Sequence, residues 1–122
     1  MQSGRGLVLM VGGQAKHASG GCYASSTVVE CYDARHGTWS AHAPLQVARR
    51  DAAALNHDGD VYVLGGKVGF EYLYEDTTEY VSSVELLEQY SEKDEWRQVA
   101  PLSIPRACAA AASRSPWPSL VS

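Results

Sequence analysis

The side chains best suited to chemistry in this sequence are its three cysteines and four histidines. Thiolates and imidazoles bind zinc or copper when they recur at short spacings such as Cys-x-x-Cys. These residues are spread along the chain without such a pair: Cys22, Cys31, Cys108, His17, His36, His42 and His57. We therefore expect no metal site and no cofactor. An odd and sparse set of cysteines is typical of a reducing compartment, which predicts a cytoplasmic protein.

A second feature that could do chemistry is a pair of glycines that ends each of two strand-like runs, LVLMVGGQ at 7–14 and DVYVLGGK at 60–67. Glycine pairs can cradle a phosphate, but the Walker form ends in Gly-Lys-Ser/Thr and opens a helix. Gly66 and Lys67 are followed by Val68, and Gly13 is followed by Gln14. The sequence therefore predicts neither a phosphate site nor a catalytic residue, so we do not expect an enzyme.

Composition limits the classes of partner. The 122 residues are 45% apolar and 20% charged, which is typical of one folded globular domain. The net charge is −4, and the basic residues form no cluster beyond Arg49 and Arg50, which argues against a nucleic-acid partner. The longest apolar run near the start, LVLMV, is too short for a membrane span or a signal-peptide core.

The glycine pairs begin an internal repeat. After each pair come a Glu-x-Tyr, a tryptophan, a Pro-Leu and an arginine, in that order. The offset between copies is 53 residues for the glycines, 58 for the Glu-x-Tyr and 57 for the later markers: Glu30 and Tyr32 with Glu88 and Tyr90, Trp39 with Trp96, and Arg49 with Arg106. We interpret these recurring aromatic residues and arginines as structural, because recurrence is typical of packing positions.

Each copy is predicted to hold four short strands. In the second copy these are 52–57, 60–66, 84–91 and 95–100, and Asp58-Gly59 predicts a tight hairpin turn between the first two. The third of them also has a helical alternative, because Ser82 and Glu85 stand at capping-box spacing before good helix formers. The first copy, STVVECYD, is β-branched, and the repeat therefore favours a strand.

This series of markers resembles kelch repeats, and the APL…R segment is most similar to the kelch domain of Kelch-like proteins, which carry BTB and BACK regions ahead of the propeller. The resemblance implies an all-β fold of kelch-type β-propeller blades, each a four-stranded antiparallel sheet, in an incomplete set of about two blades. We expect a partial repeat over 1–50 whose first strand is missing, a complete repeat over 51–106, and the start of a third repeat with a divergent tail over 107–122. The chain is then expected to be a fragment of a larger kelch protein.

For Kelch-like proteins, the resemblance implies that partner proteins bind the loops between second and third strands and the segments between blades. Here these are 14–27, 67–83, 46–51 and 103–107. The candidate binding residues are Gln14, His17, Arg50, Lys67, Phe70, Tyr72, Tyr74 and Tyr80. Exposed aromatic side chains are typical anchors for a partner, although in the segment 67–83 they could instead cover the floor of their own loop.

The resemblance leaves three functions open. The first is the substrate-recognition propeller of a cullin ubiquitin-ligase adaptor, which would reach the cullin only through the BTB and BACK regions absent here. The second is a cytoskeletal, actin-associated kelch protein. The third is a kelch-fold enzyme of the oxidase or epimerase kind. We expect the first, with recognition by loop side chains and no chemistry by this chain.

Overall fold

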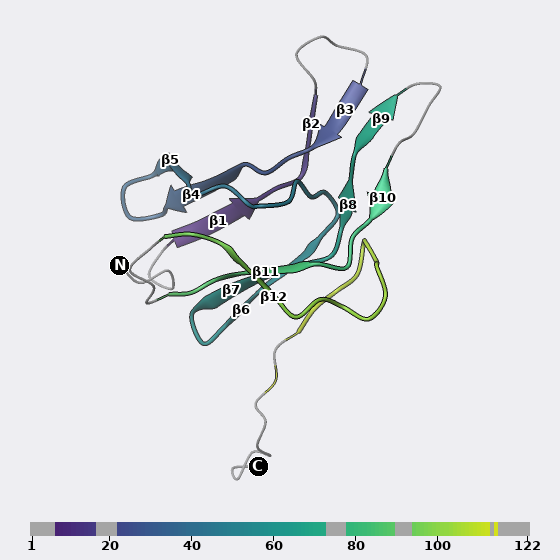
Figure 1. Cartoon of the computed structure of the whole chain (residues 1–122). Helices are drawn as coiled ribbons and strands as arrows, with labels where there is room; N and C mark the ends of the chain where they lie inside the picture. The colour runs from purple at the N-terminus through teal and green to yellow at the C-terminus, as the bar shows by residue number, and fades with distance from the viewer. Residues whose placement is uncertain (1–6, 17–21, 73–77, 90–93, 113, 115–122) are drawn as a thin grey trace.

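The computed structural model describes residues 7–16, 22–72, 78–89, 94–112 and 114. Over these residues the chain contains β-strands and no helix, as expected of an all-β fold (Figure 1). The strands are β1 (Leu7–Val11), β2 (Gln14–Lys16), β3 (Cys22–Ser25), β4 (Val29–Asp33), β5 (Thr38–His42), β6 (Ala53–His57), β7 (Asp60–Leu64), β8 (Lys67–Val68), β9 (Phe70–Tyr72), β10 (Glu79–Tyr80), β11 (Val84–Leu87) and β12 (Arg97–Val99).

Two of the sheets correspond to the two predicted repeats. The second repeat forms a four-stranded antiparallel sheet in the order β12-β11-β7-β6, and we call it the second blade. The first repeat forms a three-stranded antiparallel sheet in the order β1-β4-β5, and we call it the first blade. In the described residues the second blade thus has four strands and the first blade has three. That the opening strand is missing from the first repeat stays a prediction.

The hairpin of the second blade has the predicted turn. Asp58 and Gly59 have φ values of 52° and 90°, and His57 pairs with Asp60 across them. Positive φ at both central residues is the geometry that the Asp-Gly pair favours. The third strand of this blade is also confirmed as a strand, β11, which ends at Leu87, earlier than predicted. The helical alternative is therefore wrong for 84–87.

The strand pairing corrects one part of the repeat alignment. Val11 pairs with Val29 in the first blade, and Leu64 pairs with Val84 in the second. When the two copies are aligned at their glycine pairs, Glu85 therefore occupies the position of Glu30. The predicted match of Glu30 to Glu88, at an offset of 58, is wrong because a two-letter pattern recurred out of register. The extra residues of the second copy are divided between two connections, before and after its third strand.

The glycines are required by a close approach of the backbone. Gly12 has a φ of 65°, and a Cβ there would lie 2.7 Å from the carbonyl oxygen of Arg49. Gly65, its equivalent, also has a φ of 65°, and a Cβ there would lie 2.5 Å from the carbonyl oxygen of Arg106. In both blades the segment that leaves the fourth strand therefore passes against the end of the second strand, where no side chain fits.

We expect Gly12→Ala to lower the free energy of unfolding by about 2–4 kcal/mol, because left-handed strain and overpacking add together. Gly13→Ala is the matched control, since Gly13 has a φ of 98° but nothing within 4 Å of its Cβ position. This control is expected to lose only the strain, about 1–2 kcal/mol. Urea denaturation followed by circular dichroism measures both, and equal losses would mean that the close approach does not matter.

The apolar core lies between the two blades. Its buried members come from both of them and from the segment that joins them: Val29, Leu45, Val63, Leu87 and Trp96. The indole Nε1 of Trp96 donates a hydrogen bond of 3.0 Å to the carbonyl oxygen of Ala43, so the polar end of the buried ring is satisfied. The two blades therefore pack against each other across this core.

Candidate partner-binding site

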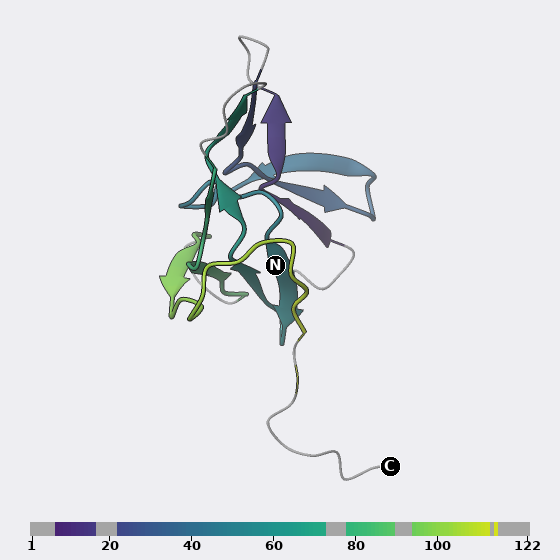
Figure 2. The same ribbon diagram turned by 90° about the vertical axis from the view of Figure 1, so that its right-hand side faces the viewer.

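The segments between the second and third strands of each blade form strands, although we expected loops. The first contributes β2 and β3, and the second contributes β8, β9 and β10. They form one sheet in the order β2-β3-β9 and another in the order β10-β8, which we call together the loop sheet. Figures 1 and 2 show this loop sheet projecting from one end of the two blades.

The loop sheet joins the two blades. β3 pairs with β9 from Cys22 opposite Tyr72 to Ala24 opposite Phe70. The pairing continues past β9, since the backbone N–H of Ser25 donates to the carbonyl oxygen of Gly69 at 3.2 Å. Segments that are about 50 residues apart in the sequence therefore build one surface. Strand pairing also holds this surface more rigidly than a loop, which reduces the entropy that a partner must overcome on binding.

Lys67 lies at the base of this surface beside the exposed ring of Tyr80. Their strands pair directly, and the ammonium Nζ of Lys67 is 5.7 Å from the centre of the ring, within the range of a cation–π contact. The same Nζ is 3.7 Å from Oδ2 of Asp51, and the hydroxyl of Ser25 donates to the carbonyl oxygen of Lys67 at 2.8 Å. Tyr80 is 62% exposed, so it presents a large aromatic surface, and the contact with Lys67 holds its ring in place.

The structure brings several of the predicted binding residues into the loop sheet. Gln14 is exposed at the start of β2, and Phe70 and Tyr72 are the ends of β9. Arg50 is buried, so its side chain is not presented to a partner, although its backbone N–H and C=O pair with Lys67 at 3.0 and 2.8 Å. The predictions for His17 and Tyr74 fall outside the described residues.

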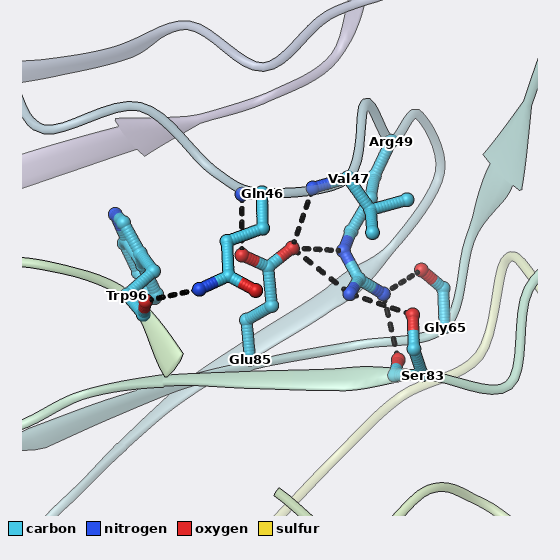
Figure 3. A network of polar contacts seen from close by, with 7 residues as sticks. All are labelled: Gln46, Val47, Arg49, Gly65, Ser83, Glu85 and Trp96. Atoms are coloured by element: carbon cyan, nitrogen blue, oxygen red, sulfur yellow. Dashed lines mark hydrogen bonds and ion pairs between the residues drawn. The ribbon is translucent and has the colours of Figure 1, made fainter. Parts of the chain in front are cut away.

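A buried ion pair supports this site, and sequence reasoning missed its acidic half. Glu85 is 0% exposed, and its carboxylate accepts hydrogen bonds from the backbone N–H groups of Gln46 and Val47 at 2.6 and 3.1 Å. It also accepts from Nε and Nη2 of Arg49 at 3.1 and 3.0 Å (Figure 3). The segment that leaves the first blade is thus fastened to the third strand of the second blade.

The guanidinium of Arg49 is fully used in this contact. Nη1 donates to the carbonyl oxygens of Gly65 and Ser83 at 2.9 and 2.6 Å, and Nη2 donates to the hydroxyl of Ser83 at 2.9 Å. The interpretation of this recurring arginine as a structural donor is confirmed. Glu85 could have been found only with the corrected register, because the Glu-x-Tyr pattern pointed to Glu88 instead.

Comparison with known proteins agrees with this geometry. The family model described as Kelch motif matches residues 48–103, which include the whole second blade. The chain contains kelch repeats. It is also similar to Kelch-like protein 4 of Homo sapiens, with 38% identity over 91 residues, which are 74% of this chain and 11% of that protein. The chain therefore spans about a tenth of the length of this curated relative. Both findings support a protein-binding kelch module, and no helix in the described ranges could span a membrane.

A small cavity of about 190 Å³ lies between the two kelch blades and brings together a thiol, an imidazole and a carboxylate. Nε2 of His42 is 3.1 Å from Oδ2 of Asp94, and Cys31 lines the same space. Such a trio can activate a cysteine nucleophile when the thiol loses its proton readily. Here burial raises the pKa of the Cys31 thiol, and the negative charges of Asp33 and Asp94 raise it further. The thiol is therefore held protonated, as in a structural cysteine.

The described residues contain no group of three or more His, Cys, Asp and Glu side chains placed to hold a metal ion. Among the predicted structural aromatics, Trp96 is buried at 3% exposure while its equivalent Trp39 is 52% exposed. Tyr90 lies outside the described residues. The same residue type at equivalent positions of two kelch repeats thus has two environments. The face of the second blade that holds Trp96 is covered, while the equivalent face of the first blade, which holds Trp39, is exposed.

Proposed function

We propose that this chain binds a partner protein through the loop sheet, as part of the substrate-recognition propeller of a Kelch-like ubiquitin-ligase adaptor. The observation that carries the proposal is the pairing of β3 with β9, which joins segments of two kelch repeats in one sheet. In this proposal, contact with a cullin comes from BTB and BACK regions. The adaptor role is part of the proposal, because the chain matches 11% of the length of Kelch-like protein 4. A cytoplasmic location stays a prediction.

The described chemistry of the loop sheet favours an aromatic anchor with charged neighbours. Tyr80 is exposed over Lys67, and Glu79 beside it is also exposed. Aromatic side chains dominate many protein interfaces because they bury a large area at a small entropic cost. β10 and β2 stand at the ends of the strand orders β10-β8 and β2-β3-β9. Outer strands are where a partner can add a strand to a sheet. The actin-associated alternative rests on the same repeats and stays a prediction.

We expect Tyr80→Ala to weaken partner binding at least tenfold, which is about 1.4 kcal/mol, because it removes the exposed anchor while the paired backbone remains. The chain is used as bait in a cell extract, and each captured protein is then titrated in purified form against wild type and variant. Deletion of 70–80 is a weaker test, since it removes β9 and β10 and with them the pairings with β3 and β8.

The matched control for this test is Trp39→Ala, which removes another exposed aromatic side chain outside the loop sheet. We expect the control to retain partner affinity within about twofold, as is usual for positions outside an interface. The binding site is wrong if Tyr80→Ala retains the affinity, or if both variants lose it equally.

A further inference from the structure

The two blades carry equivalent faces, of which only one is covered. In the second blade, the face toward the first is buried or partly buried at Val61, Val63, Glu85 and Trp96. When the two repeats are aligned at their glycine pairs, the strand pairing places four residues of the first blade at the same positions. We call these the open face, and they are Val8, Met10, Glu30 and Trp39. All four are exposed, with Val8 at 54% and Met10 at 58%.

The second blade is covered by the first blade and by the segment between the blades. Leu45 of that segment enters the core, and Arg49 pairs with Glu85. The chain that leaves the second blade repeats this segment over 100–106, and we call its part 103–106 the open link. The open link contains Ile104, which is 58% exposed, and the exposed Arg106 at the position of Arg49.

The backbone of the open link already has the conformation of the segment that binds Glu85. Arg49 N donates to Ser26 O at 3.0 Å, and Arg106 N donates to Val81 O at 3.2 Å. Likewise Gly13 N donates to Arg49 O, and its equivalent Gly66 N donates to Arg106 O. These backbone hydrogen bonds hold the segment in place, while Arg106 is exposed.

The residues after the open link extend the equivalence. Asp51 and Cys108 stand at the same place in the two repeats and share a left-handed backbone, with φ values of 55° and 56°. β6 follows Asp51 and pairs with β7 in the second blade. Residues 109–112 follow Cys108 without a strand assignment, and β1 is the edge of the first blade in the order β1-β4-β5. Residues 109–112 thus stand at the repeat position of β6, and β1 stands at the position of β7, with which β6 pairs.

We propose that this chain associates head to tail with a second copy, so that the open link of one copy covers the open face of the next. Arg106 of one copy then pairs with Glu30 of the other, as Arg49 pairs with Glu85 within one chain, and residues 109–112 add to the edge of β1. In Figure 1 the first blade lies at the upper left and the yellow-green chain after β12 at the lower right. Two different surfaces that complement each other give a heterologous contact, which forms a ring or an open chain.

The chemistry of the two surfaces predicts a reversible contact. The charges are opposite, and apolar side chains surround each of them. However, one hydrogen bond of the Arg49–Glu85 contact is not reproduced. Nη2 of Arg49 donates to the hydroxyl of Ser83, and the equivalent residue in the first blade is Val28, so Arg106 finds one acceptor fewer on the second copy. We therefore expect association that depends on concentration and weakens at high salt, where exposed charges are screened. The proposal does not rest on the loop sheet.

Sedimentation equilibrium of the purified full chain tests the proposal, with circular dichroism to monitor folding. The wild type is expected to gain mass as its concentration rises. Glu30→Arg and Arg106→Glu are each expected to weaken self-association at least tenfold, because each places like charges together. Their equimolar mixture is expected to regain wild-type association, since the two reversed charges then meet with opposite signs, while the native Arg106 of one variant meets the native Glu30 of the other.

Two matched variants control for net charge. Glu79→Arg and Arg35→Glu make the same charge changes at exposed positions outside the open face, the open link and residues 109–112, and they are expected to associate like wild type. A monomer at all concentrations, association that the single variants leave unchanged, or a mixture that stays dissociated each overturns the proposal. If the single variants precipitate, co-expression of the two replaces sedimentation, and failure to raise the soluble yield above that of either variant alone overturns it equally.

Discussion

Replacing Glu85 by alanine is expected to lower the free energy of unfolding by about 3–5 kcal/mol, the cost of leaving one charge of a buried pair without its partner. Both Glu85 and Arg49 are buried, and their side chains are each 0% exposed. The variant also leaves the backbone N–H groups of Gln46 and Val47 without their acceptor. Since a domain is stable by only about 5–15 kcal/mol, much of the chain is expected to unfold.

Glu88→Ala is the matched control for this prediction. Glu88 also pairs with an arginine, Arg97, but their side chains are 43% and 57% exposed. Surface pairs contribute about 0–1 kcal/mol because water screens them and holding two long side chains costs entropy. Urea denaturation, followed by far-ultraviolet circular dichroism, should therefore separate the two glutamates clearly. A loss below about 1 kcal/mol for Glu85→Ala would contradict the structural role given to the ion pair.

The double variant Arg49→Met with Glu85→Met separates charge from packing. When both charges of a buried pair are replaced by apolar groups, no unpaired charge remains, and stability is often nearly conserved. We expect the double variant to be more stable than either single one. Additive losses would mean that the two side chains act independently, despite their contacts of 3.0 and 3.1 Å.

Replacing Trp96 by alanine is expected to cost about 3–5 kcal/mol, as for other large aromatic side chains in a core. Trp96 is 3% exposed between the blades, and its indole donates to Ala43. The variant therefore opens a cavity at the centre of the contact between blades and leaves the partly buried carbonyl group of Ala43 without its donor. Its denaturation midpoint should fall steeply.

Trp39→Ala is the control that the repeat itself provides. Trp39 stands at the same repeat position, but it is 52% exposed and contacts Tyr32 with 4.9 Å between ring centres. We expect it to lose about 1 kcal/mol or less. Equal losses at Trp39 and Trp96 would show that the tryptophan stabilises each blade by itself and that the contact between blades contributes little.

Much of the fold could be predicted from the sequence because the signals are local. The alternation of DVYVL, the Asp58-Gly59 turn and the glycine pairs each fix backbone geometry within a few residues, and the structure confirms them. The third strand was harder to predict, since VELLEQ is rich in helix formers. The partner strand β7 overrides that preference by pairing with Val84–Leu87.

The candidate site could be predicted only in outline. That these segments bind a partner stays a prediction. Their conformation was missed, because β3 and β9 become strands only by pairing with each other. Arg50 was expected to face a partner and is buried, although its neighbour Arg49 was correctly assigned to structure. Both arginines are buried, at 1% and 4% exposure, because the segment between the blades packs against the second blade, and the sequence of that segment does not show this contact.

By itself, the sequence determined that this chain is built from repeated antiparallel units and where the glycine pairs end a strand, since those properties follow from local pattern and from glycine. Only the tertiary structure decided which copy of each repeated residue does what. Glu85 and Trp96 are buried, while Glu30 and Trp39 are exposed, although their positions are equivalent. The physical reason is that the burial of a residue depends on which segment packs against its face of the sheet. The sequence of one repeat does not show which segment that is.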